Sequence, residues 1–404
     1  MFLDSLIWWL GSIVLTSFLL ITAYFLIRRL VLEQFWIPST GKYTLITGCD
    51  SGFGRLLAIR LLKERRVNVF AACFTDKGVQ SLIDEWELME GAKGHLYTLK
   101  LDITNDESVK SAREYVENIL QQKNGKLWSL INNAGLFSIH GPDDWVGTNE
   151  FSHAIDVNFL GAVRMCHAFG PLLKKSKGRI VTMGSTAGRL HGLFVGSYAA
   201  SKAAVGKYMD CLRFEMSQYN VSVHILEPGC FKTELLNQEA QKNRIDKIWD
   251  SLDEDVRNEY GEDYKQKFVV AWGMGVNWAA NTNLNWVVDC YIHAQFSWYP
   301  RLRYAPGWDA IFVFIPLSLV PTFVGDWMLN ILYLLHPGPT LIPAALQQEK
   351  RKSKAKLIMT IGSFLAQLSM IPLIYTAFFA KESMHQKSVT VPQNHTTKEP
   401  ANPF

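Results

Sequence analysis

Cysteine and charge are both scarce in this 404-residue sequence. The six cysteines are scattered and include no C-x-x-C pair, which argues against a disulfide scaffold and against a zinc module. Charged residues make up 19% of the chain and the net charge is +4, which argues against a nucleic-acid partner. No metal site is expected, and 48% hydrophobic residues exclude a disordered chain.

Two long uncharged runs stand near the ends of the chain. Residues 5–27 would span about 34 Å as a helix, enough to cross a bilayer. Arg28 and Arg29 follow this run, so residues 1–30 are expected to be an uncleaved membrane anchor rather than a signal peptide. The second run, residues 357–380, follows a basic cluster. We expect a basic flank and a membrane helix over 350–380, then a polar tail over 381–404.

Both basic flanks lie on the side of the middle segment, so the positive-inside rule predicts that residues 28–356 face the cytosol. A third apolar stretch, 310–325, is short and contains Pro316 and Pro321. It is expected to be an interfacial or re-entrant segment or a buried helix, within an apolar membrane-associated region over 311–335.

The middle of the chain alternates short β-rich runs with segments of helix length. This alternation predicts a parallel sheet covered on both faces, as one α/β domain over residues 40–310. The expected strands are Tyr43–Thr47, Val67–Cys73, His95–Leu101, Leu127–Ile131, Arg179–Met183 and Val221–Leu226; Phe53–Glu64 and Glu107–Leu120 are expected helices.

A glycine-rich turn follows the first expected strand. Its glycines, Gly48, Gly52 and Gly54, are followed by a helix. Glycines let the backbone turn sharply and approach a pyrophosphate, which the N–H groups at the start of the helix then bind. An ordinary tight turn is the alternative, but the strand-turn-helix context favours a dinucleotide site.

A second group of residues carries hydroxyl and amine chemistry. Ser185 ends the fifth expected strand, Tyr198 follows, and Lys202 comes four residues later on the same helix face. Each has a structural alternative as a cap, a half-buried ring or a solvated amine. Their position after a dinucleotide turn makes the combination specific.

Taken in order, these motifs resemble those of short-chain dehydrogenases/reductases over residues 40–235. The matching residues are Thr47–Gly54, Asp102, Asn132, Asn133, Ala134, Gly135, Asn158, Ser185, Tyr198, Lys202, Pro228 and Gly229. The resemblance implies a Rossmann-type doubly wound sheet. It also implies that Asn158, Ser185, Tyr198 and Lys202 form a catalytic tetrad, with Ser185 on the substrate oxygen.

The same resemblance assigns the cofactor contacts. The expected set is Gly48, Ser51, Gly52, Phe53, Gly54, Asp102, Asn133, Ala134, Gly135, Tyr198, Lys202, Pro228, Gly229 and Thr233. Asp102 would contact the adenine, and Pro228 to Thr233 would lie by the nicotinamide. Asp50 and Asp76 favour NAD, whereas the basic residues Lys77 and Arg55 weaken that argument and leave NADP as the less favoured cofactor.

Hydride transfer from an alcohol needs a base, and a tyrosine is a poor one at neutral pH. An ammonium about 4 Å away contributes roughly 4 kcal/mol, or about three pK units, at an effective dielectric of 20. Lys202 is therefore expected to bring the pKa of Tyr198 close to neutrality. Asn158 would hold a water that relays the proton, by the resemblance.

The closer resemblance is to the retinol and hydroxysteroid dehydrogenase branch, on Gly48–Gly54, Leu226–Gly229 and Arg303–Ala310. Residues 233–310, rich in tryptophan, are expected to form the substrate-binding region for a large apolar alcohol or ketone. The expected protein is a membrane-bound, NAD-dependent retinol dehydrogenase that also accepts 3α- or 17β-hydroxysteroids, in the endoplasmic reticulum. A homodimer is left open. The alternatives are a dehydrogenase of a small hydroxy acid such as 3-hydroxybutyrate and a catalytically silent nucleotide-binding scaffold.

Overall fold

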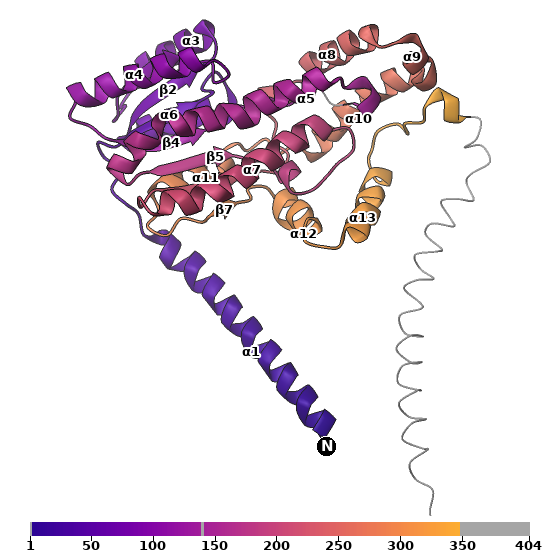
Figure 1. Ribbon diagram of the computed structural model, residues 1–404, viewed down its shortest axis with the longest axis horizontal. Helices are drawn as coiled ribbons and strands as arrows, with labels where there is room; N and C mark the ends of the chain where they lie inside the picture. The colour runs from indigo at the N-terminus through magenta and orange to yellow at the C-terminus, as the bar shows by residue number, and fades with distance from the viewer. Residues whose placement is uncertain (1, 139–140, 348–404) are drawn as a thin grey trace, which may run out of the picture. The chain divides into compact units, whose positions relative to one another are not determined.

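A computed structural model describes residues 2–138 and 141–347 (Figure 1). Seven strands in this part of the chain form one parallel sheet in the order β3-β2-β1-β4-β5-β6-β7. The strands are β1 (Tyr43–Thr47), β2 (Asn68–Cys73), β3 (Leu96–Lys100), β4 (Leu127–Asn132), β5 (Arg179–Met183), β6 (Ser222–Leu226) and β7 (Arg303–Tyr304). The order reverses at β1, so the predicted doubly wound sheet is confirmed.

Helices connect these strands and continue beyond them. They are α1 (Phe2–Leu30), α2 (Gly52–Glu64), α3 (Asp76–Glu87), α4 (Asp106–Gln122), α5 (Thr148–Ile155), α6 (Gly161–Ser176), α7 (Gly196–Ser217), α8 (Gln238–Ser251), α9 (Glu254–Tyr260), α10 (Glu262–Ala279), α11 (Asn285–Phe296), α12 (Ile315–Leu317) and α13 (Thr322–Leu334). The predicted strand and helix bounds agree with these to within one or two residues. The short edge strand β7 was not predicted.

The two faces of the sheet are buried under different helices (Figure 1). Leu45 of β1 packs with side chains of α4, α6 and α7, whereas its neighbour Ile46 packs with α2, α3 and α11. This alternation follows from the pleat of a strand, which directs successive side chains to opposite faces. All five residues of β1 are buried, as expected for an inner strand of a parallel sheet.

The chain divides into two compact units. The larger comprises Met1–Arg257 and Lys265–Leu341 and contains the sheet; the smaller comprises Asn258–Tyr264 and Ile342–Phe404. In the smaller unit, the rings of Tyr260 and Tyr264 pack edge to face with their centroids 5.1 Å apart. The expected basic flank, second membrane helix and polar tail, from residue 350 onward, lie outside the described residues.

The expected anchor is a helix. Within the described residues, one helical stretch, Trp8–Gln34, is long and apolar enough to cross a membrane, and its most apolar part is not buried. The third apolar stretch is broken as its prolines predict. A turn separates α12 from α13, and Pro321 precedes the first residue of α13. Leu319 and Phe323 are 75% and 67% exposed, whereas Leu317 is 5% exposed and packs in a cluster with Leu190 and Leu329, so the stretch is buried on one side only.

Candidate active site

The site residues stand at the carboxyl ends of the strands, the edge at which doubly wound sheets bind ligands. The turn after β1 is closely packed. Gly48 has φ +72°, and a Cβ there would lie 2.8 Å from Cα of Ala134. A Cβ on Gly54 would lie 2.4 Å from the carbonyl oxygen of Gly48 and 2.5 Å from Nδ2 of Asn133. Side chains are therefore excluded at both positions, which leaves the backbone of the turn open to a ligand.

Asn133 holds this turn in place from the end of β4. Its Nδ2 donates to the carbonyl oxygens of Thr47 (2.9 Å) and Gly48 (3.1 Å). The backbone N–H groups of Asn133 and Ala134 both donate to Oγ1 of Thr47. The hydroxyl of the fully buried Tyr291, on α11, donates to Oδ1 of Asn133 over 3.2 Å. The sequence motifs gave no reason to assign Tyr291 a role at this site.

The start of α2 offers backbone donors to an anion. Ser51 precedes the helix, and its side chain makes no capping hydrogen bond to the first turn. The N–H groups of a first helical turn lack carbonyl partners within the helix and attract negative charge. Gly52 lies across from Thr233, whose Cβ is 3.8 Å from the position of a Cβ on Gly52. The ring of Phe53 packs edge to face against Phe231.

Asp50 connects this turn to the end of β2. Its Oδ2 accepts from the N–H of Phe74 (2.8 Å), and its Oδ1 accepts from the N–H (2.9 Å) and Oγ1 (2.7 Å) of Thr75. Arg55 is held by Glu85, with its Nη2 2.7 Å from Oε2. Asp76 forms an exposed ion pair with Lys100.

Asp102 follows β3. Its Oδ1 accepts from both the N–H (2.9 Å) and Oγ1 (2.7 Å) of Thr104, so the carboxylate is held in one orientation. The half-buried carboxylate therefore stands at the same edge of the sheet as the turn after β1.

The four expected catalytic residues come from three elements. Asn158 lies in the π-helical turn Asp156–Leu160 between α5 and α6, Ser185 follows β5, and Tyr198 and Lys202 lie on α7. The side chain of Ser185 lies near the Tyr198 hydroxyl and acts to lower its pKa, and Nζ of Lys202 is 5.7 Å from the centroid of the Tyr198 ring. A Cβ on Gly135 would lie 2.9 Å from Oδ1 of Asn158 and 3.4 Å from Nζ of Lys202. The four side chains therefore gather around the end of β4.

Asn158 fixes the segment that follows Gly135. Its Oδ1 accepts from the N–H of Leu136 (2.9 Å), and its Nδ2 donates to the carbonyl oxygen of Leu136 (3.0 Å) and to Oγ of Ser201 (2.9 Å). Both amide protons are used in these bonds. The π-helical turn displaces one residue from the regular spiral, a feature frequent at functional sites.

Burial dominates the electrostatics of Tyr198 and Lys202. It raises the pKa of Tyr198 to about 12, and the nearby Ser185 side chain opposes this rise. It also lowers the pKa of Lys202 to about 8. The expected lowering of the Tyr198 pKa by Lys202 is therefore absent from the protein alone. The expectation considered charge attraction without desolvation, and Nζ of Lys202 donates to the carbonyl oxygen of Met183 (3.1 Å).

The loop after β6 is held by an aspartate that the sequence analysis did not assign. Oδ2 of Asp309 accepts from the N–H of Cys230 over 2.6 Å, and a Cβ on Gly229 would lie 2.1 Å from Oδ1 of Asp309. Burial raises the pKa of Asp309. The N–H of Thr186 donates to the carbonyl oxygen of Pro228, so this loop adjoins the segment that carries Ser185.

Aromatic rings continue from Tyr198 into the expected substrate region. The Phe137 ring lies 4.8 Å from that of Tyr198 and stacks on Trp272 at 5.4 Å. A second group, formed by Trp145, Phe194, Trp249 and Phe268, has ring centroids 5.1–5.4 Å apart. Phe137, Trp145 and Phe194 lie outside residues 233–310 and were missed. Conversely, Trp278, Trp298 and Trp308, inside that range, are more than 60% exposed.

The turn after β1 fits a dinucleotide, because Gly48 and Gly54 leave no room for side chains and the first turn of α2 is not capped by Ser51. Comparison with known proteins agrees with this reading. Residues 42–244 match the family model of the short chain dehydrogenases. The chain is 61% identical over 378 residues to a 3beta-hydroxysteroid dehydrogenase of Caenorhabditis elegans, covering 93% of this chain and 96% of that one.

Two further likenesses are more distant. Retinol dehydrogenase 7 of Rattus norvegicus is 40% identical over 285 residues, covering 70% of this chain and 86% of its own. A short chain dehydrogenase/reductase from Burkholderia phymatum, solved in complex with NAD, superposes with a TM-score of 0.54 at 21% identity, covering 69% of this chain and 93% of that one. The latter confirms the fold.

Proposed function

Because the chain belongs to the short-chain dehydrogenase/reductase family, in its retinol and hydroxysteroid dehydrogenase branch, we propose that it oxidises a membrane-dissolved hydroxysteroid with NAD. Its class of activity is that of a nicotinamide-dependent alcohol dehydrogenase. The observation that carries the proposal is the grouping of Tyr198 with Lys202, whose Nζ is 5.7 Å from the Tyr198 ring, and with Phe137, whose ring lies 4.8 Å from that of Tyr198.

Tyr198 is the proposed base and Ser185 the group that binds the substrate oxygen. The side chain of Ser185 acts on the pKa of Tyr198, so the two hydroxyls belong to one site, and an alcohol oxygen bound there would be within reach of both. When bound, the nicotinamide cofactor accepts the hydride. Ser185 would then steady the developing carbonyl, as a preorganised donor does.

Lys202 is the proposed relay for the proton that Tyr198 receives. A pKa of about 8 places this amine near the pH of the cell, where proton exchange is fastest. The proposed role of Asn158 is to shape the path of this proton, because its side chain holds the backbone of Leu136 beside Gly135. In the reductive direction Tyr198 donates the proton.

The cofactor would be held at the carboxyl ends of the strands. Gly48, Ser51, Gly52, Phe53 and Gly54 would hold the pyrophosphate, Asp102 the adenine, and Pro228, Gly229 and Thr233 the nicotinamide end, with Asn133, Ala134 and Gly135 forming the floor between them. Tyr198 and Lys202 would contact the nicotinamide side.

NAD is favoured over NADP by the charges at the end of β2. The Asp50 carboxylate accepts from Phe74 and Thr75 directly after β2, where a 2′-phosphate would meet its negative charge. The guanidinium of Arg55 is held by Glu85 and Ser81 and does not offer a free cation there. Lys77 is exposed on the first turn of α3 and is the remaining basic residue that argues for NADP.

A hydroxysteroid is favoured over retinol because the 3beta-hydroxysteroid dehydrogenase matches 93% of this chain. Retinol remains the second candidate, from the 40% identity to a retinol dehydrogenase. The aromatic wall around Phe137 and Trp272 suits a large apolar alcohol and does not favour 3-hydroxybutyrate.

The proposed setting is the endoplasmic reticulum membrane, with the catalytic domain, residues 40–310, facing the cytosol. The anchor over 1–30 rests on the apolar stretch Trp8–Gln34. The region 311–335 would contact the membrane too, since Phe312, Leu319 and Phe323 are exposed. A homodimer stays a prediction.

The test is nicotinamide reduction by the solubilised full chain, comparing NAD with NADP against a 3β-hydroxysteroid, all-trans-retinol and 3-hydroxybutyrate. We expect the highest kcat/KM with the steroid and NAD, and a fall in kcat of about 10²–10⁴ in Tyr198→Phe. Turnover of 3-hydroxybutyrate alone would overturn the substrate class. A chain that binds NAD but turns over none of the three would support the scaffold alternative.

A further inference from the structure

The chain directly after the membrane helix is paired with the segment that precedes β7. The N–H of Ile37 donates to the carbonyl oxygen of Phe296 (2.7 Å), and the N–H of Trp298 donates to that of Phe35 (2.8 Å). Arg28, in the last turn of α1, donates from Nη2 to the carbonyl oxygen of Pro300 (3.1 Å). Hydrogen bonds therefore connect the last turn of the helix, and the chain just after it, to the catalytic domain.

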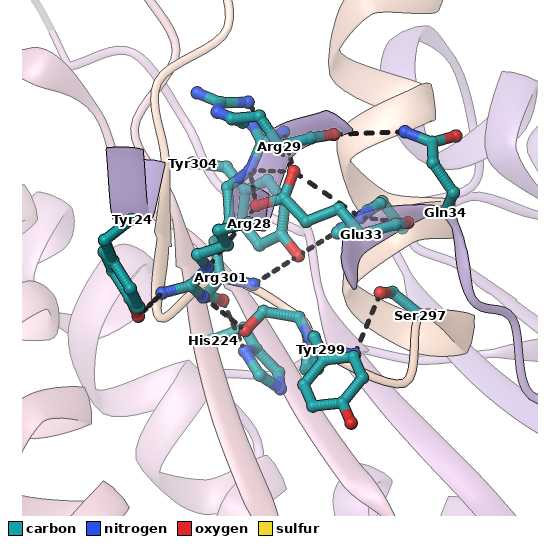
Figure 2. A network of polar contacts seen from close by, with 12 residues as sticks. Tyr24, Arg28, Arg29, Glu33, Gln34, His224, Ser297, Tyr299, Arg301 and Tyr304 are labelled. Carbon is teal, nitrogen blue, oxygen red and sulfur yellow. Dashed lines mark hydrogen bonds and ion pairs between the residues drawn. The ribbon is translucent and has the colours of Figure 1, made fainter. Parts of the chain in front are cut away.

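A buried carboxylate strengthens this junction. Glu33 is 3% exposed, and Nε of Arg301 lies 2.9 Å from both of its oxygens. Arg28 and Arg29 lie 3.6 and 3.8 Å from the same carboxylate. Figure 2 shows these three arginines gathered around Glu33. One carboxylate neutralises one guanidinium, so the group carries two positive charges in excess.

The neighbouring histidine does not change this balance at neutral pH. His293 accepts or donates through Nδ1 with the Tyr304 hydroxyl over 2.7 Å. Burial, with the positive charge of Arg301, lowers the pKa of His293 to about 4. The positive excess therefore comes from the arginines, and the side chain of Arg29 is 52% exposed.

Large apolar side chains surround the same junction and face outward. Phe35, Trp298, Tyr299 and Leu302 are each about half exposed or more. We call these four residues, with Arg28 and Arg29, the collar. Tryptophan and tyrosine favour the boundary between lipid and water, where an apolar ring and a polar tip are both accommodated. Arginine beside them favours anionic headgroups.

We propose that the collar is an interfacial docking surface that seats the catalytic domain on the headgroup region of an anionic bilayer. The proposal rests on the membrane anchoring proposed above. A bilayer crossed by α1 reaches the collar because Arg28 and Phe35 bond directly to the segment that carries Trp298 and Tyr299. The collar combines positive charge with interfacial rings, which complements an anionic lipid surface better than it does a second, likewise positive copy of this chain.

The experiment places a fluorescent bimane on single cysteines of the full chain in liposomes with brominated acyl chains. The background variant is Cys211→Ser, which removes the exposed cysteine. Leu302→Cys reports on the collar, and Leu20→Cys reports on α1. Leu88→Cys is the matched control, because it is an exposed leucine after α3, beside β2 and β3 at the sheet edge opposite β7.

We expect strong quenching at positions 302 and 20 and none at 88. Quenching at 302 should be greater in phosphatidylserine than in phosphatidylcholine vesicles, and Arg29→Gln should weaken this preference about fivefold. Quenching at 20 without quenching at 302 would overturn the collar and leave the anchor standing. Absence of quenching at both would overturn the anchor itself. If the bimane at position 302 becomes less accessible to solvent as the protein concentration rises, and is not quenched by the lipid, the surface binds a second copy of the chain instead.

Discussion

On the cofactor side of the site, Asn133 donates two hydrogen bonds to the backbone of the turn after β1, whereas on the substrate side Phe137 meets Tyr198 and Trp272 through ring faces. Hydrogen bonds require a donor and an acceptor at a set distance and angle. Ring contacts depend on size and shape, and several apolar residues satisfy them. The cofactor side therefore tolerates almost no exchange of residues, and the substrate side tolerates many.

This difference predicts how substitutions separate the two sides. A change on the cofactor side should alter dinucleotide affinity for every substrate. A change on the substrate side should alter KM for apolar alcohols while the cofactor binds as before. Substitutions where the two sides meet should lower the rate of the reaction and change neither the cofactor affinity nor the substrate affinity.

The largest effect is expected where the two sides meet, at Tyr198. Tyr198→Phe removes the proposed base and keeps the ring that packs against Phe137. We expect kcat to fall by about 10²–10⁴, the usual contribution of general acid-base catalysis, while NAD affinity is unchanged. Steady-state rates and fluorescence titration with NAD measure the two quantities. Tyr208→Phe, on the same helix, is the control and should keep its rate; a Tyr198→Phe enzyme with normal turnover contradicts the assignment.

On the cofactor side, Gly54→Ala should have the next largest effect. The added methyl group would meet the carbonyl oxygen of Gly48 and Nδ2 of Asn133 at 2.4–2.5 Å, so the turn must shift. Such overpacking costs about 1–3 kcal/mol, which as lost binding free energy is roughly a five- to 150-fold loss of NAD affinity. Calorimetric titration of the folded variant provides the measurement.

Gly206→Ala is the matched control for this substitution, because a Cβ on Gly206 in α7 would meet nothing within 4 Å. The control should bind NAD normally and gain up to about 1 kcal/mol of stability. Equal NAD affinity in the two variants would show that the turn after β1 is not the dinucleotide site.

The same contrast explains which site residues could be predicted from the sequence. Gly48 and Gly54 were predicted because a sharp turn between a strand and a helix requires glycine there, whereas Asn133 was named by the resemblance. The π-helical position of Asn158 has no such local signature, and its residue identity came from the resemblance alone. The fold followed from the alternation of strands and helices, which is a local property.

Residues whose role depends on distant packing escaped prediction. Tyr291 meets Asn133 across 158 residues of sequence, and Asp309 reaches Cys230 across 79. No periodicity or spacing marks such pairs. Aromatic composition placed the substrate region broadly after residue 233, yet Phe137 contributes from just after β4. The pKa of Tyr198 was misjudged because the burial of its hydroxyl is also a tertiary property.

On the substrate side, Phe137→Ala should raise KM for an apolar alcohol without changing NAD affinity. Burial of an aromatic side chain contributes about 1.5–3 kcal/mol, so the rise should be roughly tenfold or more. Phe214→Ala is the control, since Phe214 is 74% exposed on α7. Loss of NAD affinity in Phe137→Ala, with KM unaltered, would remove the proposed division between the two sides.

The smallest effect is expected from Tyr291→Phe, which tests whether long-range support belongs to the cofactor side. The substitution removes the hydroxyl that donates to Oδ1 of Asn133 and leaves the buried ring in place. A hydrogen bond contributes about 0.5–1.5 kcal/mol, so NAD affinity should fall roughly two- to tenfold, with kcat at saturating NAD unchanged. In an Asn133→Ala background, Tyr291→Phe should have no further effect, because the acceptor is already gone. An equal loss in both backgrounds would mean that Tyr291 acts through the packing of α11 and not through Asn133.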